Sequence, residues 1–155
     1  MNKGLTFAWV ASNFVGALFT FLRGRETALP ALKRNQIIDI TSQVGSVVNP
    51  SGIANGDVIV YCPHTTAAIT INENADPSVP HDILLILEQH IPHHCSGYRH
   101  TEGNSDAHAK SSIIGCSKQL LVSGGALVLG TWQGIFFCEF DGPRSRKVIV
   151  QIRGE

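Results

Sequence analysis

Histidine side chains are concentrated in the most polar segments of this 155-residue chain. Three of the seven histidines, His64, His100 and His108, lie near the expected ends of strands or helices, where a side chain can be held rigidly. Neutral imidazole binds zinc or a similar divalent ion through one ring nitrogen. We therefore predict that these three side chains, from three separate segments, converge on a divalent metal ion, zinc or magnesium. The remaining clustered histidines are interpreted as exposed loop residues: His90, His93 and His94.

Carboxylates near these histidines are candidates to orient the imidazole rings or to act as general acid or base: Glu73, Glu102 and Asp82. Glu73 belongs to residues 72–76, which carry four polar groups directly after an apolar strand, more than a turn requires. The alternative is a polar loop that ends in a helix cap at Asp76. Asp82 lies in the first turn of the expected helix, where it suits the helix dipole, so a purely structural role is the alternative there.

Amide and amine side chains in the same segments are candidates to bind a substrate or cofactor: Asn72, Asn104 and Lys110. Asn104 and His108 are four residues apart and therefore lie on one face of the expected helix, whereas Lys110 projects in another direction. Gln133 lies between two glycines in residues 130–134, and we predict that it is a catalytic hydrogen-bonding group in a pocket wall. The alternative for this segment is a β-bulge with a packed tryptophan.

Two guanidinium groups lie in the loop Asp141–Arg146, where Pro143 stiffens the backbone and Gly142 permits a sharp bend. Arginine forks match the oxygens of phosphate or carboxylate groups. We predict that Arg144 and Arg146 form the anion-binding edge of the site. The alternative is a solvated hairpin loop without a ligand.

The composition is that of one folded domain with an α+β fold. Apolar residues make up 43% of the chain and charged residues 15%, which argues against disorder. The formal net charge of zero, and the absence of aromatics interleaved with basic residues, argue against nucleic-acid binding. The four cysteines have no CxxC spacing and are interpreted as reduced thiols, most of them buried.

The apolar pattern predicts the elements that must position these residues. Strands are expected at residues 27–33, 36–40, 57–62, 66–71, 118–122, 126–129, 134–140 and 147–152. Helices are expected at residues 41–48, from Asp76-Pro77 to about His90, and from Asn104 to the residue before Gly115. Strands, then helices, then strands without βαβ alternation predict mainly antiparallel, sandwich-like sheets with two to three helices.

The amino-terminal segment Leu5–Leu22 has 18 uncharged residues between basic ones. We predict that it is helical and packs outside the domain, which divides the chain into an extension at residues 1–25 and a domain at residues 26–155. A membrane helix needs about 20 apolar residues, so membrane contact through residues 5–22 is the alternative to a cytoplasmic protein.

Three motifs together resemble the YjbQ-like family, called secondary thiamine-phosphate synthase. They are PHTTAAITINENADPSVPHD at 63–82, YRHTEGNSDAHAKSSIIG at 98–115 and GTWQGIFFCEFDGPRSR at 130–146. The resemblance implies a homotrimer of α+β subunits with the site near a subunit boundary. Carried over to this chain, it implies these site residues: His64, Glu73, His100, Glu102, His108, Gln133 and Arg144.

Two functions remain open at this stage. The first is a metal-dependent enzyme that acts on a phosphorylated small molecule, where the resemblance implies joining a pyrimidine diphosphate to a thiazole phosphate with release of pyrophosphate. The second is a noncatalytic trimeric module that binds a metal or small ligand. The first requires a general acid or base beside the metal, and the second does not.

Overall fold

The structure is a computed structural model, and it describes residues 7–10 and 21–155. The strands are β1 (Phe7–Val10), β2 (Phe21–Ala31), β3 (Gln36–Asp39), β4 (Gly56–Tyr61), β5 (Ala67–Glu73), β6 (Ser117–Ser123), β7 (Ala126–Leu127), β8 (Gln133–Glu139) and β9 (Arg144–Gly154). The helices are α1 (Thr41–Val48), α2 (Ser78–His90) and α3 (Ser105–Ile114), and a short 3-10 helix (Asn49–Ser51) follows α1.

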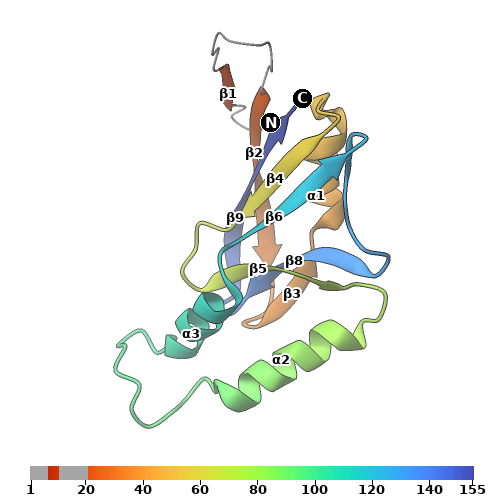
Figure 1. The fold of residues 1–155 in the computed structure, drawn as a ribbon. Coiled ribbons are helices and arrows are strands. Elements are labelled where there is room, and N and C mark those ends of the chain that lie inside the picture. The colour runs from red at the N-terminus through yellow and green to blue at the C-terminus, as the bar shows by residue number, and fades with distance from the viewer. Residues whose placement is uncertain (1–6, 11–20) are drawn as a thin grey trace.

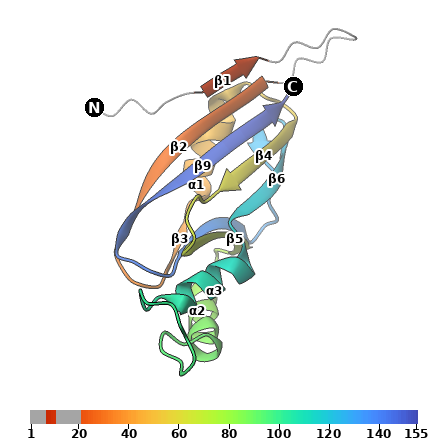
Figure 2. The same cartoon turned by 90° about the vertical axis from the view of Figure 1, so that its left-hand side faces the viewer.

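Two antiparallel sheets form the frame of the molecule. The large sheet has the strand order β1-β2-β9-β4-β6-β7, and the small sheet has the order β3-β8-β5. Figures 1 and 2 show the central strands of the large sheet side by side, with α2 and α3 together at one end of the molecule. The predicted α+β fold with mainly antiparallel sheets and three helices is therefore confirmed.

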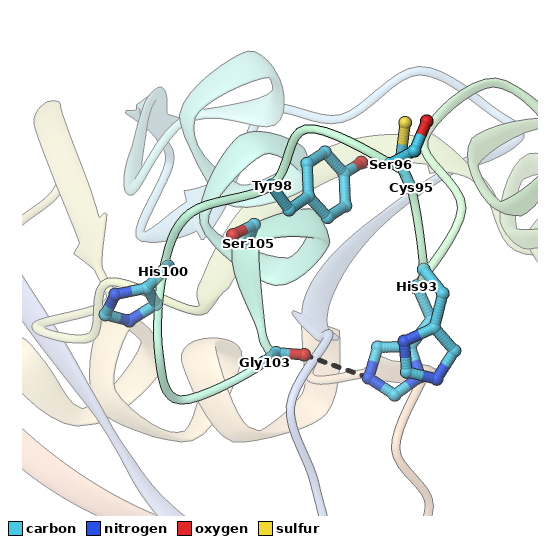
Figure 3. A pocket seen from close by; sticks show the side chains of 8 residues that line it. His93, Cys95, Ser96, Tyr98, His100, Gly103 and Ser105 are labelled. Carbon is cyan, nitrogen blue, oxygen red and sulfur yellow. Dashed lines mark hydrogen bonds between the residues drawn. The ribbon is translucent and has the colours of Figure 1, made fainter.

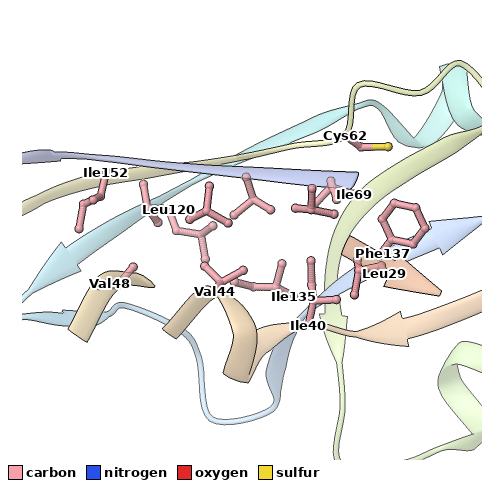
Figure 4. Close-up of a cluster of buried hydrophobic side chains, with 14 of the residues drawn as sticks. Leu29, Ile40, Val44, Val48, Cys62, Ile69, Leu120, Ile135, Phe137 and Ile152 are labelled. Carbon is pink, nitrogen blue, oxygen red and sulfur yellow. The ribbon is translucent and has the colours of Figure 1, made fainter. Parts of the chain in front are cut away.

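The main apolar core lies between the large sheet and a second layer made of α1 and the small sheet (Figure 4). Val58, Val60 and Val150 from the large sheet meet Val44 of α1 and Phe137 of β8. These residues alternate along their strands with side chains on the other face, as expected of sheets packed on one side. The core holds the small sheet rigidly, and the small sheet in turn carries the polar residues at its strand ends.

A smaller apolar cluster lies on the opposite face of the small sheet, beneath α2 and α3. Cys138 and Phe140 contribute from β8 and its end, and Ala107 contributes from α3. Helix α2 supplies only partly buried residues to this cluster, and its Leu85 and Ile86 are exposed. The chain is thus layered as large sheet, then α1 and small sheet, then α2 and α3.

The amino-terminal segment differs from the expected helix. Phe7–Val10 and the start of β2 form an antiparallel pair, with Phe7 opposite Gly24 and Val10 opposite Phe21. The helix prediction is therefore wrong for these residues. Uncharged β-branched and aromatic residues suit a sheet edge as well as a helix, so an apolar run alone does not distinguish the two. Residues 5–6 and 11–20 of that prediction lie outside the described residues.

Within residues 7–10 and 21–155, no helix is long and apolar enough to cross a membrane.

Several strand and helix ends also differ from the sequence expectation. Strand β5 continues through Asn72 and Glu73, and β9 begins at Arg144, so both arginines of the predicted loop belong to a strand. Helix α2 begins at Ser78, which leaves Asp82 in its second turn rather than its first. Side chains at element ends hydrogen-bond to neighbouring segments, and these contacts decide the boundaries more than local propensity does.

Candidate functional site

The start of β5, helix α3 and the turn between β8 and β9 meet at one end of the small sheet. The Ser111 hydroxyl of α3 donates a hydrogen bond to the carbonyl oxygen of Thr65, in the loop before β5. The side-chain amide of Asn104, at the start of α3, donates to Asp141 at 2.9 Å. Helix α3 is therefore fixed to the sheet at both of its ends.

His100 and His108 lie together at this end of the sheet. Their ring centroids are 5.1 Å apart and their planes are inclined by 83°. His108 is half-buried on α3, and His100 is exposed on the loop that leads into it. The Glu102 carboxylate lies 3.8 Å from Nε2 of His100, beyond hydrogen-bond distance, and both side chains are exposed.

His64 is engaged elsewhere. Its Nε2 accepts a hydrogen bond of 2.9 Å from the backbone N–H of Lys147, which requires the neutral imidazole with its proton on Nδ1. Burial and the nearby Arg146 guanidinium both lower the pKa of His64, in agreement with that neutral form. Among the described residues, no three histidine, cysteine or acidic side chains are arranged to hold a metal. One chain therefore pairs two of the three predicted ligands and does not complete the predicted set.

A buried ion network underlies α3. Asp106, fully buried, accepts from Arg34 and from Lys110, each at 2.9 Å. Burial pushes the pKa of Asp106 upward, but Lys110 and Arg34 outweigh burial, and the net pKa is lowered. The structure corrects the expectation that Lys110 binds a ligand, because its side chain is only 1% exposed and its charge is neutralised within the fold.

Asp141 connects three segments of the chain. It accepts from Asn104 at 2.9 Å, from Arg144 at 2.8 Å and from Arg34 at 3.2 Å. Nε of Arg144 also donates to the backbone carbonyl of Asp141 at 2.8 Å. The Arg144 side chain nevertheless remains 53% exposed, so its guanidinium is oriented by Asp141 and still accessible from solvent.

Arg146 forms a buried fork with Glu139. Its Nε and Nη2 each lie 2.6 Å from a carboxylate oxygen of Glu139, and Nη2 also donates to the Thr66 hydroxyl at 2.8 Å. Both side chains are buried, and removing one partner of such a pair costs about 3–5 kcal/mol. The expectation that Arg146 contacts an anion is therefore corrected, because this guanidinium joins β8 to β9 and does not face solvent.

A second group of predicted site residues lies at the other end of β5. Glu73 is the cross-strand partner of Gln133, and Asn72 lies beside them. Gln133 accepts from the backbone N–H of Gly130 at 2.8 Å, which closes its own turn. Strand β5 has seven residues, so its two ends lie about 20 Å apart.

Asp82 joins neither group. It lies on α2, where its carboxylate is 3.0 Å from Nδ1 of the neighbouring His81, with both side chains exposed.

A depression of about 360 Å³ lies on the loop that precedes α3 (Figure 3). It is lined by His93, His94, Cys95, Ser96, Tyr98, His100, Gly103 and Ser105. Nε2 of His93 donates to the carbonyl oxygen of Gly103 at 3.0 Å, and the rings of His93 and His94 stack with centroids 4.0 Å apart. His93 lies in a loop, as expected, but it is half-buried rather than exposed and shapes the loop that carries His100. The loop interpretation of His90 is wrong, because His90 is the last residue of α2.

Sequence reasoning missed Arg34 and the central role of Asp141. Arg34 lies in the turn between β2 and β3, far from every motif, and nothing in its immediate sequence marks its contacts with Asp106 and Asp141. The sequence predicts no role for Asp141 beyond the start of the loop that carries the two arginines. The sequence does contain one signal for this role, because Asp141 lies three positions before Arg144 and the two side chains form an ion pair in the structure.

The three-dimensional arrangement and the sequence both match known proteins. The model of the UPF0047 protein YjbQ-like family matches residues 25–155. The chain belongs to this family. A UPF0047 protein of Methanocaldococcus jannaschii is 53% identical over 123 residues, 79% of this chain and 88% of its own length. The UPF0047 protein YugU of Bacillus subtilis is 51% identical over 122 residues, 79% of this chain and 92% of its own length.

Solved structures of YjbQ-like proteins share the fold. An uncharacterized conserved protein of the family from Clostridium acetobutylicum is 54% identical, with a TM-score of 0.80 over 82% of this chain and 98% of that chain. A YbjQ-like protein of unknown function from Sulfolobus solfataricus is 33% identical, with a TM-score of 0.84 over 88% of this chain and 99% of that chain. The family assignment therefore establishes the fold, while the activity has to be argued from the site.

Proposed function

We propose that this UPF0047 protein is a metal-dependent enzyme that acts on a phosphorylated small molecule. The observation that carries the proposal is the perpendicular pair His100 and His108, 5.1 Å apart, with Glu102 beside it. Two imidazoles bound to one tetrahedral zinc ion have ring centroids about 5 Å apart, given a zinc–nitrogen distance of about 2.0 Å. Two aromatic rings in an edge-to-face packing contact have a similar centroid distance, so a measurement of metal binding distinguishes the two arrangements.

The residues around the pair fit a bound divalent ion in part. His100 and His108 would supply two imidazole nitrogen ligands, and Glu102 would orient His100. When bound there, a divalent ion supplies charge neutralisation for a leaving pyrophosphate. Arg144, held by Asp141 but still exposed, would bind phosphate oxygens with its guanidinium.

The missing part of the site is proposed to come from a second chain. Glu73 and Gln133 lie at the far end of β5, a strand about 20 Å long, so a small ligand held by the two histidines would not reach them within one chain. In a cyclic trimer each chain presents two different surfaces to its neighbours, so opposite ends of the small sheet can meet at every boundary. We place the complete site there, with His100 and His108 from one chain and Glu73 from the next.

The reaction proposed within this class is that of a secondary thiamine-phosphate synthase. It joins a pyrimidine diphosphate to a thiazole phosphate and releases pyrophosphate. Glu102 or Glu73 is the proposed general acid or base. The competing function is a noncatalytic module that binds a metal or small ligand. Such a module needs no general acid or base beside the metal, so it requires no contribution from Glu73 of another chain.

Zinc binding tests the proposal directly. We expect zinc affinity, measured by calorimetry on metal-free protein, to fall by more than about 100-fold in His108→Ala, because losing an outer-shell partner alone costs about 10–100-fold. Glu102→Gln, which removes only an outer-shell partner, should lower zinc affinity by about 10–100-fold. His90→Ala, an exposed histidine at the end of α2, is the matched control and should bind as the wild type does. Equal affinity in His108→Ala and His90→Ala would contradict the metal site.

Turnover separates the two functions. Incubation of the protein with the pyrimidine diphosphate and thiazole phosphate should release pyrophosphate, and a chelator should abolish that release. Zinc binding without turnover of these substrates would favour the noncatalytic module.

A further inference from the structure

Cys62 and Cys116 lie opposite one another at the ends of two paired strands. The register of β4 and β6 pairs Tyr61 with Ser117, so the next residues outward, Cys62 and Cys116, are cross-strand neighbours. The backbone N–H of Cys62 donates to the carbonyl oxygen of Cys116 at 2.8 Å, which continues the ladder by one step. Both cysteines carry free thiols.

This geometry suits a disulfide. Hydrogen-bonded cross-strand pairs have Cα atoms about 5.5 Å apart, within the range of about 4.4–6.8 Å seen in disulfides. Directly opposite side chains also point to the same face of a sheet, with Cβ atoms about 4.5–5.5 Å apart. A disulfide needs Cβ atoms about 3.5–4.5 Å apart. In a hydrogen-bonded pair such as this one the Cβ distance is near the upper value, so the bond needs an approach of about 1–2 Å. Each cysteine lies just outside its strand, but Gly115, next to Cys116, accepts a hydrogen bond of 3.0 Å from the backbone N–H of Ile69, so the approach has to come from the Cys62 side and from side-chain rotation.

The two thiols differ in accessibility. Cys116 is exposed, whereas Cys62 is only 1% exposed and lies at the edge of the main core (Figure 4). An external oxidant therefore reaches Cys116 first, and Cys62 is the neighbouring thiol that can complete the bond. Cys95 is also exposed, but it lies in the loop before α3, and Cys138 is buried on β8.

We infer that Cys62 and Cys116 form a reversible intramolecular disulfide that joins the β4–β5 loop to the end of α3. With a small disulfide as oxidant, the Cys116 thiolate attacks one sulfur and releases one thiol. Burial raises the pKa of the Cys62 thiol to about 11, so Cys62 has to lose its proton before it attacks the mixed disulfide, and that proton passes to the departing thiolate, which leaves as the second thiol. Two protein thiols are oxidised and one small disulfide is reduced to two thiols, so atoms and electrons balance.

The position of this bond connects it to the candidate site. Cys62 is two residues before His64, and Cys116 is two residues after Ile114, the last residue of the helix that carries His108. Oxidation would add a covalent link between the β4–β5 loop and the carboxyl end of α3, which the reduced chain joins only through hydrogen bonds such as Cys62–Cys116 and Ser111–Thr65. An effect on metal binding or turnover rests on the proposed function, whereas formation of the bond does not.

Peptide mapping tests the inference. The reduced full-length protein is equilibrated with oxidised and reduced glutathione at a series of ratios, free thiols are alkylated, and the non-reduced digest is analysed by mass spectrometry. We expect one cross-linked peptide pair containing Cys62 and Cys116, lighter by two hydrogens than the separate peptides and lost on addition of excess reduced glutathione.

Variants make the result specific. Cys116→Ser should abolish the cross-link, whereas Cys95→Ser, which removes the other exposed thiol, should leave it unchanged. A cross-link that involves Cys95, one between chains, or glutathione retained on Cys116 without transfer to Cys62 would overturn the inference. The mapping reads cysteines alone, so a failure of the proposed enzymatic activity does not affect its outcome.

Discussion

Arg144 and Arg146 show how strongly a single residue's role depends on its surroundings. They lie two positions apart on β9, but Arg146 is buried in a fork with Glu139 and Arg144 is half exposed beside Asp141. A guanidinium saturated by a buried carboxylate stabilises the fold, whereas one oriented by a carboxylate and still accessible can bind an anion. The sequence shows two similar arginines, and only the partners distinguish them.

Replacing Arg144 should weaken anion binding. A charge-assisted hydrogen bond contributes about 1.5–3 kcal/mol, so Arg144→Ala should lower pyrophosphate affinity roughly tenfold or more, measured by calorimetry. Arg144→Lys should recover only part of this affinity, because it keeps the charge and loses the bidentate geometry. Lys147→Ala, an exposed cation on the same strand, is the matched control. Unchanged affinity in Arg144→Ala would mean that this turn carries no anion site.

Asp141 should make stability depend on pH. Burial raises its pKa, but Asn104, Arg144 and Arg34 together outweigh burial and lower it. A carboxylate with a lowered folded pKa stabilises the protein above its unfolded pKa of about 3.9, and this contribution is lost as the pH falls through the folded pKa.

The experiment compares the free energy of unfolding of the wild type and Asp141→Asn by urea denaturation at several pH values. We expect a difference of about 2 kcal/mol at pH 7 that shrinks as the pH falls below about 4. Asp82→Asn, at an exposed carboxylate on α2, should change stability by less than about 0.5 kcal/mol. A difference between wild type and Asp141→Asn that stays constant down to pH 3 would contradict the assigned ion pairs.

Element by element, the sequence predicted most of the domain and failed where distant contacts decide. Alternating and helical apolar patterns placed the central strands and all three helices, because one face of each is buried. The continuation of β5 through Glu73 was missed because its polar residues are paired with β8, a partner sixty residues away. The pairing of Phe7–Val10 with β2 was missed for the same reason, since apolar content does not reveal a strand partner.

Gly142 illustrates such a distant contact and gives a prediction for the β8–β9 turn. A Cβ atom there would lie 2.1 Å from the carbonyl oxygen of Lys33, in the turn between β2 and β3. Backbone cannot rotate away as a side chain can, so Gly142→Ala should destabilise the protein by about 1–3 kcal/mol or more in urea denaturation.

Gly45 provides the matched control. A Cβ at this position of α1 meets nothing within 4 Å, and alanine has the higher helix propensity, so Gly45→Ala should leave stability unchanged or raise it by up to about 1 kcal/mol. Equal stability of the two variants would mean that the β2–β3 and β8–β9 turns do not meet as described.

For the whole molecule, the predicted site residues separate into two groups at opposite ends of the small sheet. His100, His108 and Arg144 lie by the start of β5, and Glu73 and Gln133 lie by its end. Sequence order cannot reveal this separation, because motifs that are close in a chain can lie at opposite ends of one strand. Under the proposed function, these two groups are half-sites that meet between neighbouring chains.

Subunit mixing tests whether the two half-sites combine. His108→Ala removes one half-site and Glu73→Gln the other, so each variant alone should release no pyrophosphate from the proposed substrates. In mixed trimers assembled at random from equal amounts, a site is intact when the histidine side comes from the Glu73→Gln chain and the glutamate side from the His108→Ala chain. That combination occurs at about one boundary in four, so co-expression should restore about a quarter of wild-type activity.

Mixing His108→Ala with His100→Ala is the control, because both changes damage the same half-site and no boundary becomes intact. Recovery in the first mixture alone supports a shared site, whereas no recovery there, with an active wild type, would place the complete site within one chain.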